Sequence, residues 1–181
     1  MATQMTPPPG APAFLNAAGW TDARIEPLAG DASFRRYFRV EDADGNRGVL
    51  MDAPPPHEDP APFVQIAGYL VQHGFRAPEV IASDLERGLV LLEDLGNRRM
   101  REHLAYHPEE EEAVYTQAID ELLKLRALPA ADVPDYSVEK YVEEANLLPE
   151  WFAPAARLRV DQPAYEALWK ELLTPVVAAQ K

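Results

Sequence analysis

The chain has 181 residues, an apolar fraction of 47% and a formal net charge of −13. The length suits one domain or slightly more, and the apolar fraction supports a packed core rather than a disordered chain. The negative charge argues against a sequence-independent nucleic-acid binder, and the absence of cysteine excludes disulfides and thiolate metal ligands. No apolar run approaches the roughly 20 residues of a membrane span and the start has no signal-peptide pattern, so we expect a cytoplasmic protein without nucleic-acid or membrane partners.

The first half of the chain is predicted to consist of strands with one inserted helix. Residues 1–13 are proline-rich and are expected to form a disordered lead-in. The expected elements are, in chain order, a helix at Phe14–Trp20, strands at Ile25–Leu28, Phe34–Val40 and Gly48–Asp52, a helix at Pro60–His73, and strands at Val80–Ser83 and Leu89–Glu93. Apolar residues recur with helical spacing along Pro60–His73, and Gly74 follows as a C-terminal cap.

The second half is predicted to be helical throughout. The expected helices are Arg98–Tyr106, Glu109–Leu128, Val138–Phe152 and Tyr165–Leu173, with Pro175 ending or kinking the last one. Glu109–Leu128 has the clearest pattern, with an acidic first turn and an internal apolar stripe. The predicted fold class is therefore α+β, with a small lobe at residues 14–96 and a partial helical lobe at residues 97–181.

A short turn of small residues leads into the second strand and is a candidate phosphate-binding element. The candidate residues are the turn Gly30, Asp31, Ala32 and Ser33, followed by Phe34, Arg35, Arg36 and Arg39. Small residues let backbone N–H groups approach phosphate oxygens, and arginines offset the phosphate charge. Asp31 would repel phosphate unless its carboxylate points away. The alternative is an ordinary hairpin turn with solvated arginines.

The third strand lacks the lysine that phosphotransferases commonly place there. Met51 or Asp52 occupies the expected position, and the first lysine of the chain is Lys124. The cationic role therefore passes to the arginines of the preceding strand, and Met51 joins the candidate nucleotide-binding residues. Glu58 and Asp59 precede a helix, where acidic residues are common without a ligand.

The fifth strand ends in an acidic pair and a glycine, a segment that we call the hinge segment (residues 93–96). Its candidate residues Glu93, Asp94 and Leu95 follow a buried strand. A strand that leaves a sheet exposes main-chain donors and acceptors that suit the edge of an adenine. The alternative is a strand followed by an acidic turn.

Other signals are weaker. Trp151 with Glu143 and Glu144 is a candidate sugar contact, chosen from position in the chain alone. His103 and His107 have a spacing that can bind a metal, but no third ligand stands at motif spacing, so no metal site is predicted. No residue is predicted to be catalytic.

Four strings, in order, resemble the aminoglycoside phosphotransferase-like kinases, and more narrowly the bacterial N-acetylmuramate/N-acetylglucosamine anomeric kinases of cell-wall recycling. They are Asp31–Arg39, Met51–Pro56, Asp84–Gly88 and Asp94–Gly96. The resemblance implies an ATP- and Mg²⁺-dependent kinase that phosphorylates a sugar hydroxyl. It also implies that the catalytic base and metal ligands lie in a loop beyond residue 181, so the chain alone is expected to be inactive.

Two further expectations remain open beside this one. The chain can be a non-catalytic nucleotide-binding or regulatory module built on half of the kinase fold, or a plain interaction protein. We also expect self-association through the apolar faces of its helices.

Overall fold

The computed structural model describes residues 5–28 and 34–179, which form parts of two compact units, 1–131 and 132–181. The predicted division into a small lobe at residues 14–96 and a partial helical lobe at residues 97–181 stays a prediction. The first unit contains, in order, α1 (Ala11–Ala17), β1 (Arg24–Pro27), β2 (Arg36–Glu41), β3 (Arg47–Asp52), α2 (Ala61–Gln72), β4 (Val80–Asp84), β5 (Leu89–Glu93), α3 (Met100–Tyr106), the 3₁₀ turn η1 (Pro108–Glu110) and α4 (Glu111–Arg126).

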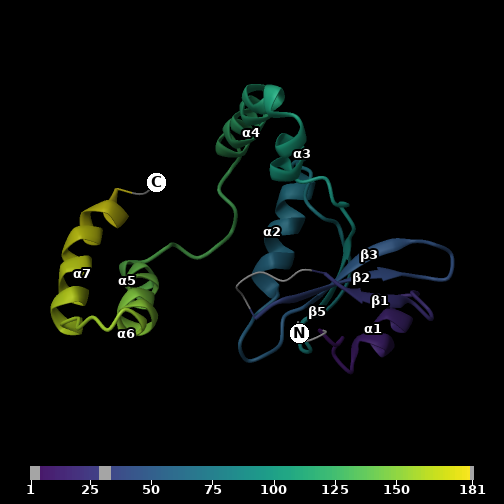
Figure 1. Ribbon diagram of the computed structural model, residues 1–181, viewed down its shortest axis with the longest axis horizontal. Helices are drawn as coiled ribbons and strands as arrows, with labels where there is room; N and C mark the ends of the chain where they lie inside the picture. Colours follow the sequence, from purple (N-terminus) through teal and green to yellow (C-terminus); the bar gives the residue numbers. More distant parts are fainter. Residues whose placement is uncertain (1–4, 29–33, 180–181) are drawn as a thin grey trace. The chain divides into compact units, whose positions relative to one another are not determined.

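The strands form one five-stranded antiparallel sheet in the order β1-β2-β3-β5-β4 (Figure 1). Consecutive strands pair except where α2 is inserted between β3 and β4, so that β5 returns to pair with β3. This confirms the predicted α+β fold class and the position of the inserted helix in a kinase-like small lobe.

Side chains alternate across the strands and build a core on each face of the sheet. On one face, Phe38, Leu50 and Leu91 are buried against Phe14 and Leu15 of α1. The opposite face buries a second set of apolar strand residues, with α2 packed against them. The members of that set are Met51, Val90 and Leu92, and the residues that pack on it include Phe63 and Val64. The helices α1 and α2 therefore cover opposite faces of the sheet.

The first helix differs from its predicted bounds. It runs from Ala11 to Ala17 rather than from Phe14 to Trp20, and Pro12 lies in its first turn. Proline suits that position because its missing N–H would have no helical partner there. The helix stops before Gly19, whose φ of +85° is outside the helical range. Trp20 consequently lies beyond the helix and packs into the core on the α1 face.

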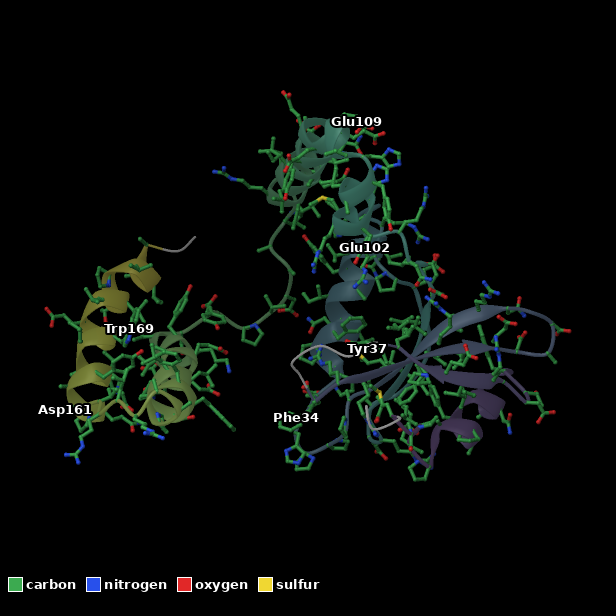
Figure 2. The ribbon with its side chains drawn as sticks, viewed as in Figure 1. Phe34, Tyr37, Glu102, Glu109, Asp161 and Trp169 are labelled. Carbon is green, nitrogen blue, oxygen red and sulfur yellow. The ribbon has the colours of Figure 1, made fainter. Side chains whose placement is uncertain are left out.

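The second unit contains α5 (Val138–Leu147), the π-helical turn η2 (Leu148–Phe152), α6 (Ala153–Ala155) and α7 (Gln162–Ala178). Ser137 and Asp161 cap α5 and α7 with side-chain oxygens. The Tyr165 hydroxyl on α7 donates to the Ala145 carbonyl on α5 at 2.9 Å. Tyr165 also contacts Trp169 edge-on within α7, and Trp169 is labelled in Figure 2.

Two predicted boundaries in this unit were wrong. The single helix expected at Val138–Phe152 changes to a π-helical turn after Leu147, because Pro149 has no N–H for the α-helical ladder. Pro175 does not end α7, which continues to Ala178. One lost hydrogen bond there is accommodated within a helix of 17 residues.

The helices α4 and α7 carry exposed apolar side chains. They include Ile119, Leu122 and Leu125 on α4, and Leu168, Leu172 and Val176 on α7. The exposed faces are the basis of the expected self-association, which stays a prediction. Within residues 5–28 and 34–179, no helix is both long and apolar enough to cross a membrane.

We predict that Gly88→Ala destabilises the fold far more than Gly45→Ala. Both glycines have positive φ, +73° and +82°, so each alanine costs about 1 kcal/mol of backbone strain. A Cβ at Gly88 would also lie 1.9 Å from the Ala53 carbonyl oxygen, whereas a Cβ at Gly45 meets nothing within 4 Å. Urea unfolding should show an additional loss of about 2 kcal/mol or more for Gly88→Ala. Equal losses would contradict the packing of the β5 start against Ala53.

Candidate functional site

A pocket of ≈ 440 Å³ lies on the face of the sheet that α2 partly covers. Its wall includes Val49 of β3, Leu92 of β5 and Phe63 of α2, and its rim is the hinge segment. Tyr37 and Arg39 of β2 share this face because they alternate with the buried Phe38. The remaining lining residues are Leu28, Pro78, Asn97 and Arg99.

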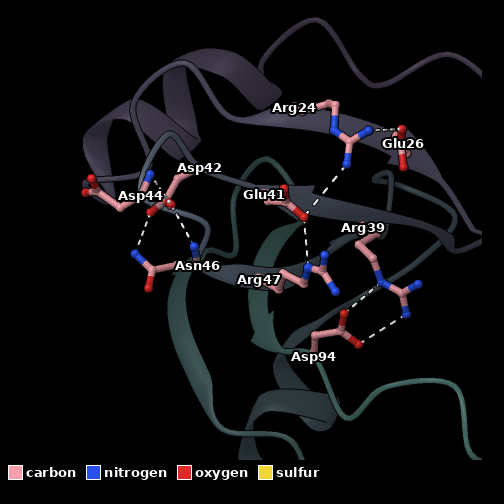
Figure 3. Close-up of polar contacts among 9 residues, drawn as sticks. All are labelled: Arg24, Glu26, Arg39, Glu41, Asp42, Asp44, Asn46, Arg47 and Asp94. Atoms are coloured by element: carbon pink, nitrogen blue, oxygen red, sulfur yellow. Dashed lines mark hydrogen bonds and ion pairs between the residues drawn. The ribbon is translucent and has the colours of Figure 1, made fainter.

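The hinge segment is held on one side by Arg39. Its Nε donates to Asp94 Oδ2 at 2.7 Å, and its Nη2 donates to Asp94 Oδ1 at 3.2 Å (Figure 3). The same Nη2 also donates to Asn97 Oδ1 at 2.9 Å. The Gly96 N–H donates to Asp94 Oδ1 at 2.8 Å. Burial opposes ionisation of Asp94, but the bonds from Arg39 and Gly96 outweigh it and lower the pKa of this carboxyl. Asp94 is therefore a structural anion.

The other side of the hinge segment is held by Arg76. Its Nη1 and Nη2 donate to Glu93 Oε2 and Oε1 at 2.8 and 2.6 Å. This bond is the main cause that lowers the pKa of Glu93, with burial opposing it and the Glu79 N–H assisting. We call the Arg39–Asp94 and Arg76–Glu93 pairs together the hinge clamp.

Because the hinge clamp occupies both acidic side chains, the main chain of the hinge segment is the part that stays available to a ligand. Both acidic side chains are occupied by arginines, so neither presents an uncompensated charge to the pocket. Among the hydrogen bonds of residues 5–28 and 34–179, none uses the Leu95 N–H. A free donor at the rim of a pocket with apolar walls suits a flat, polar-edged ring.

The four residues of the predicted phosphate turn, Gly30, Asp31, Ala32 and Ser33, lie outside the described residues, and the structure describes the chain again from Phe34. Phe34 follows them and stacks on His57, with ring centroids 5.0 Å apart. The Nε of Arg35 donates to Glu58 Oε2 at 2.9 Å. Two adjacent residues after the turn thus contact two adjacent residues of the loop between β3 and α2.

Arg36 and Met51 do not line the pocket. Arg36 is on the α1 face, where its Nε donates to Asp52 Oδ2 at 2.8 Å and a second nitrogen binds the same oxygen. Asp52 is buried, so this pair neutralises a charge in the core. Met51 faces the α2 side but is fully buried among Val90 and Leu92. We therefore leave Arg36 and Met51 out of the proposed ligand contacts.

The three candidate sugar contacts belong to the second unit. Glu143 and Glu144 both lie near Lys140, at 3.0 and 3.8 Å from its Nζ. Trp151 is 73% exposed in η2. The described contacts join Trp151 to neither glutamate, and the sugar role of all three stays a prediction.

Sequence reasoning missed the pocket walls Tyr37, Val49, Phe63 and Leu92, and Asn97, which directly follows the hinge segment. Strand alternation could have identified Tyr37 and Val49, because both lie on the same face of the sheet as Arg39. Glu58 was interpreted as helix-start acidity, which fits Asp59 instead: its Oδ1 accepts from the Ala61 N–H at 2.9 Å.

His103 of α3 and His107, which directly follows that helix, lie near an acidic cluster. His107, Glu109 and Glu110 have ligand atoms within 4.8 Å of one another, and all three residues are exposed. His103 Nε2 lies 2.8 Å from Glu110 Oε2. These contacts are satisfied between the side chains themselves, and we assign no metal to them.

Curated relatives that are similar in sequence to this chain share the name N-acetylmuramate/N-acetylglucosamine kinase. The relative from Pseudomonas aeruginosa is 39% identical over 145 residues, which cover 78% of this chain and 42% of the relative. The one from Pseudomonas putida is 38% identical over 143 residues, covering 78% and 41%. The one from Neisseria meningitidis is 34% identical over 160 residues, covering 84% and 47%. The chain thus spans less than half the length of these relatives.

The family comparison covers the whole sheet and every described helix except α1. Residues 24–180 match the model of the phosphotransferase enzyme family. This range includes the pocket, the hinge clamp and the second unit. The chain therefore belongs to the phosphotransferase enzyme family.

Proposed function

We propose that the chain is the nucleotide-binding part of an ATP-dependent sugar kinase. The observation that carries this proposal is the pocket beneath the hinge segment, which combines apolar walls with the Leu95 N–H, a main-chain donor that no hydrogen bond among the described residues uses. Its volume of ≈ 440 Å³ falls within the range of ligand sites, about 300–1,000 Å³. Adenine fills such a space, with its faces against Val49 and Leu92 and its polar edge toward residues 94 and 95.

The proposed substrate is an amino sugar, phosphorylated at its anomeric hydroxyl. The relatives support this choice, because each is named as a kinase of N-acetylmuramate and N-acetylglucosamine. In such a transfer the sugar oxygen bonds to the γ-phosphorus while the bond from that phosphorus to the β–γ bridging oxygen breaks. The hydroxyl proton passes to a base, and ADP leaves. We assign the base to no described residue of this chain.

Magnesium accompanies ATP in phosphoryl transfer, where it neutralises charge on the phosphates. The carboxylates nearest the pocket, Glu93 and Asp94, are already paired with Arg76 and Arg39. They do not fit a magnesium site, so we derive no step through the metal from the described residues.

We predict that Val49→Phe abolishes nucleotide binding and that Ile81→Phe does not. Val49 lines the pocket, so a larger ring there occupies the space of the adenine. Ile81 is 45% exposed on β4 and is not a lining residue, so its substitution places the same aromatic ring elsewhere on the sheet.

The measurement is the melting temperature with and without saturating Mg-ATP, because a ligand that binds only the folded state raises it. The original chain and Ile81→Phe should both shift upward, and Val49→Phe should not. An unchanged melting temperature of the original chain would contradict the proposed nucleotide site.

We predict that Asp94→Asn lowers the unfolding free energy by about 1–2 kcal/mol at neutral pH. The folded-state pKa of Asp94 lies below its ordinary value of 3.8. Its stabilisation is therefore fully present above that ordinary value and is lost as the pH falls through the lower folded-state pKa. Urea unfolding should show a constant difference from pH 8 to about pH 5, which shrinks below about pH 4.

The control for this prediction is Glu41→Gln. Glu41 also pairs with arginines of the sheet, with Arg47 at 2.8 Å and with Arg24 at 3.7 Å (Figure 3). These two arginine side chains are 66% and 63% exposed. Exposed pairs contribute little, so the control should lose less than about 0.5 kcal/mol. Equal losses for the two variants would show that the hinge clamp contributes no more than a surface ion pair.

The sugar assignment is tested on the natural protein that carries this sequence. Phosphorylation of the anomeric oxygen blocks ring opening, so incubation with ATP should remove the reducing end of N-acetylmuramate or N-acetylglucosamine. The matched methyl glycoside, whose anomeric oxygen is blocked, should receive no phosphate. Phosphate transfer to the methyl glycoside would place the reaction on another hydroxyl, and no transfer to any of these sugars would contradict the sugar assignment.

A further inference from the structure

Most of the polar side chains that line the pocket already have partners. The acidic side chains of the hinge segment are bound by the arginines of the hinge clamp. Arg99 pairs with Glu102 at 3.0 Å, and its side chain is 77% exposed, so most of it extends into solvent. Asn97 also lines the pocket, and only one end of its side-chain amide has a partner among the described residues. The other end of that amide is a polar group at the pocket rim that is available to a ligand.

Arg39 determines which end of the Asn97 amide is occupied. Its Nη2 lies 2.9 Å from Asn97 Oδ1. A guanidinium can only donate, so the atom that it binds must be the amide oxygen and not the amide nitrogen. Within residues 5–28 and 34–179, no hydrogen bond has Asn97 Nδ2 as its donor. The chemistry of the pair therefore fixes the orientation of the amide and leaves the N–H donors of Nδ2 for an acceptor on a ligand.

The partner that orients the amide is itself firmly held. The Asp94 carboxylate binds two nitrogens of Arg39, at 2.7 and 3.2 Å, and these two side chains are only 10% and 24% exposed. The chain turns at Gly96, whose φ is +81°, directly before Asn97. The position of the amide is therefore set before a ligand arrives, which lowers the entropic cost of binding.

The place and the chemistry of this amide fit the ribose of a nucleotide. Asn97 stands two residues after Leu95, so their Cα atoms lie within about 8 Å of each other. In the proposed site the polar edge of the adenine faces residues 94 and 95, and a ribose attached to that ring would lie within reach of the chain that leaves the hinge segment. Ribose hydroxyls are neutral acceptors that match neutral N–H donors, whereas phosphates favour a cation.

We propose that Asn97, oriented by Arg39, donates to a ribose hydroxyl of the nucleotide and makes the site prefer ribonucleosides to deoxyribonucleosides. This inference rests on the proposed nucleotide site and goes further by naming the residue that recognises the sugar of the nucleotide. A site that binds a hydroxyl rejects the analogue that lacks it, because the donor is then left without its acceptor. In this arrangement Asn97 contacts the ligand, and Arg39 is a positioning residue.

The test measures the binding of uncharged nucleosides to the full chain. Isothermal titration gives the dissociation constants of adenosine, 2′-deoxyadenosine and 3′-deoxyadenosine, and the ratio of each deoxynucleoside to adenosine isolates the contribution of one hydroxyl. The original chain should bind adenosine about three- to tenfold more tightly than at least one of the deoxynucleosides. Asn97→Leu has a side chain of similar size without a donor, so it should remove that preference.

Asn16→Leu is the matched control. Asn16 is exposed on α1 and does not line the pocket, so the same exchange there should keep both the affinity and the preference for adenosine. Arg39→Lys keeps the charge but loses the planar fork that binds Asp94 and Asn97 together, so it should reduce the preference. If Asn97→Leu fails to fold, Asn97→Ala takes its place, since Asn97 is exposed and alanine adds no bulk.

The outcomes separate this inference from the proposed function. If the original chain binds adenosine and both deoxynucleosides equally well, the role of Asn97 is overturned and the nucleotide site stands. A loss in Asn97→Leu that is equal for all three nucleosides would also overturn it, because Asn97 would then act only through the hinge clamp. An undiminished preference in Arg39→Lys would overturn the positioning role of Arg39. Failure of the original chain to bind any of the nucleosides would overturn both proposals.

Discussion

Alternation of side chains along β2 is the constraint on which the rest of the first unit depends. Successive residues of a strand face opposite sides, so Phe38 enters the core on the α1 face while Tyr37 and Arg39 face the pocket. A shift of one residue in the pairing of β2 with β3 would reverse both assignments. The buried Phe38 and Leu50, which pair across these strands, oppose that shift because they would then be exposed.

The hinge clamp follows from this arrangement. Arg39 can reach Asp94 only because both lie on the pocket face, and Arg76 reaches Glu93 from the segment before β4. The two acidic side chains are thereby neutralised in a chain of strongly negative charge. Their pairing converts what looks in the sequence like an acidic, repulsive turn into a rim whose main chain is available to a ligand.

The sequence was sufficient for the order of the elements and for the hinge, and insufficient for the roles of individual charged residues. Helical and alternating periodicities depend on local spacing, so α2, β3 and β5 were predicted nearly to the residue. Strand alternation places Arg36 on the face opposite Arg35 and Arg39, but it cannot identify their partners, which stand 16, 23 and 55 positions away. Only the folded sheet shows these partners, and the same holds for Met51, whose burial depends on α2 packing above it. The turn at Pro149 was not predicted, and of the two outcomes expected at Pro175, an end or a kink, the end is wrong because α7 continues to Ala178. Proline restricts a helix without deciding how the chain responds.

The central claim is that the main chain of the hinge segment binds the adenine of a nucleotide. An amide-resolved NMR titration of the ¹⁵N-labelled chain with adenosine tests this claim most directly, because it needs neither phosphate contacts nor catalysis. The account predicts that the amide signals of Asp94 and Leu95 shift most, together with those of Val49 and Leu92, while the signals of α1 stay in place. Shifts confined to other parts of the chain, or no shifts at saturating adenosine, would contradict it.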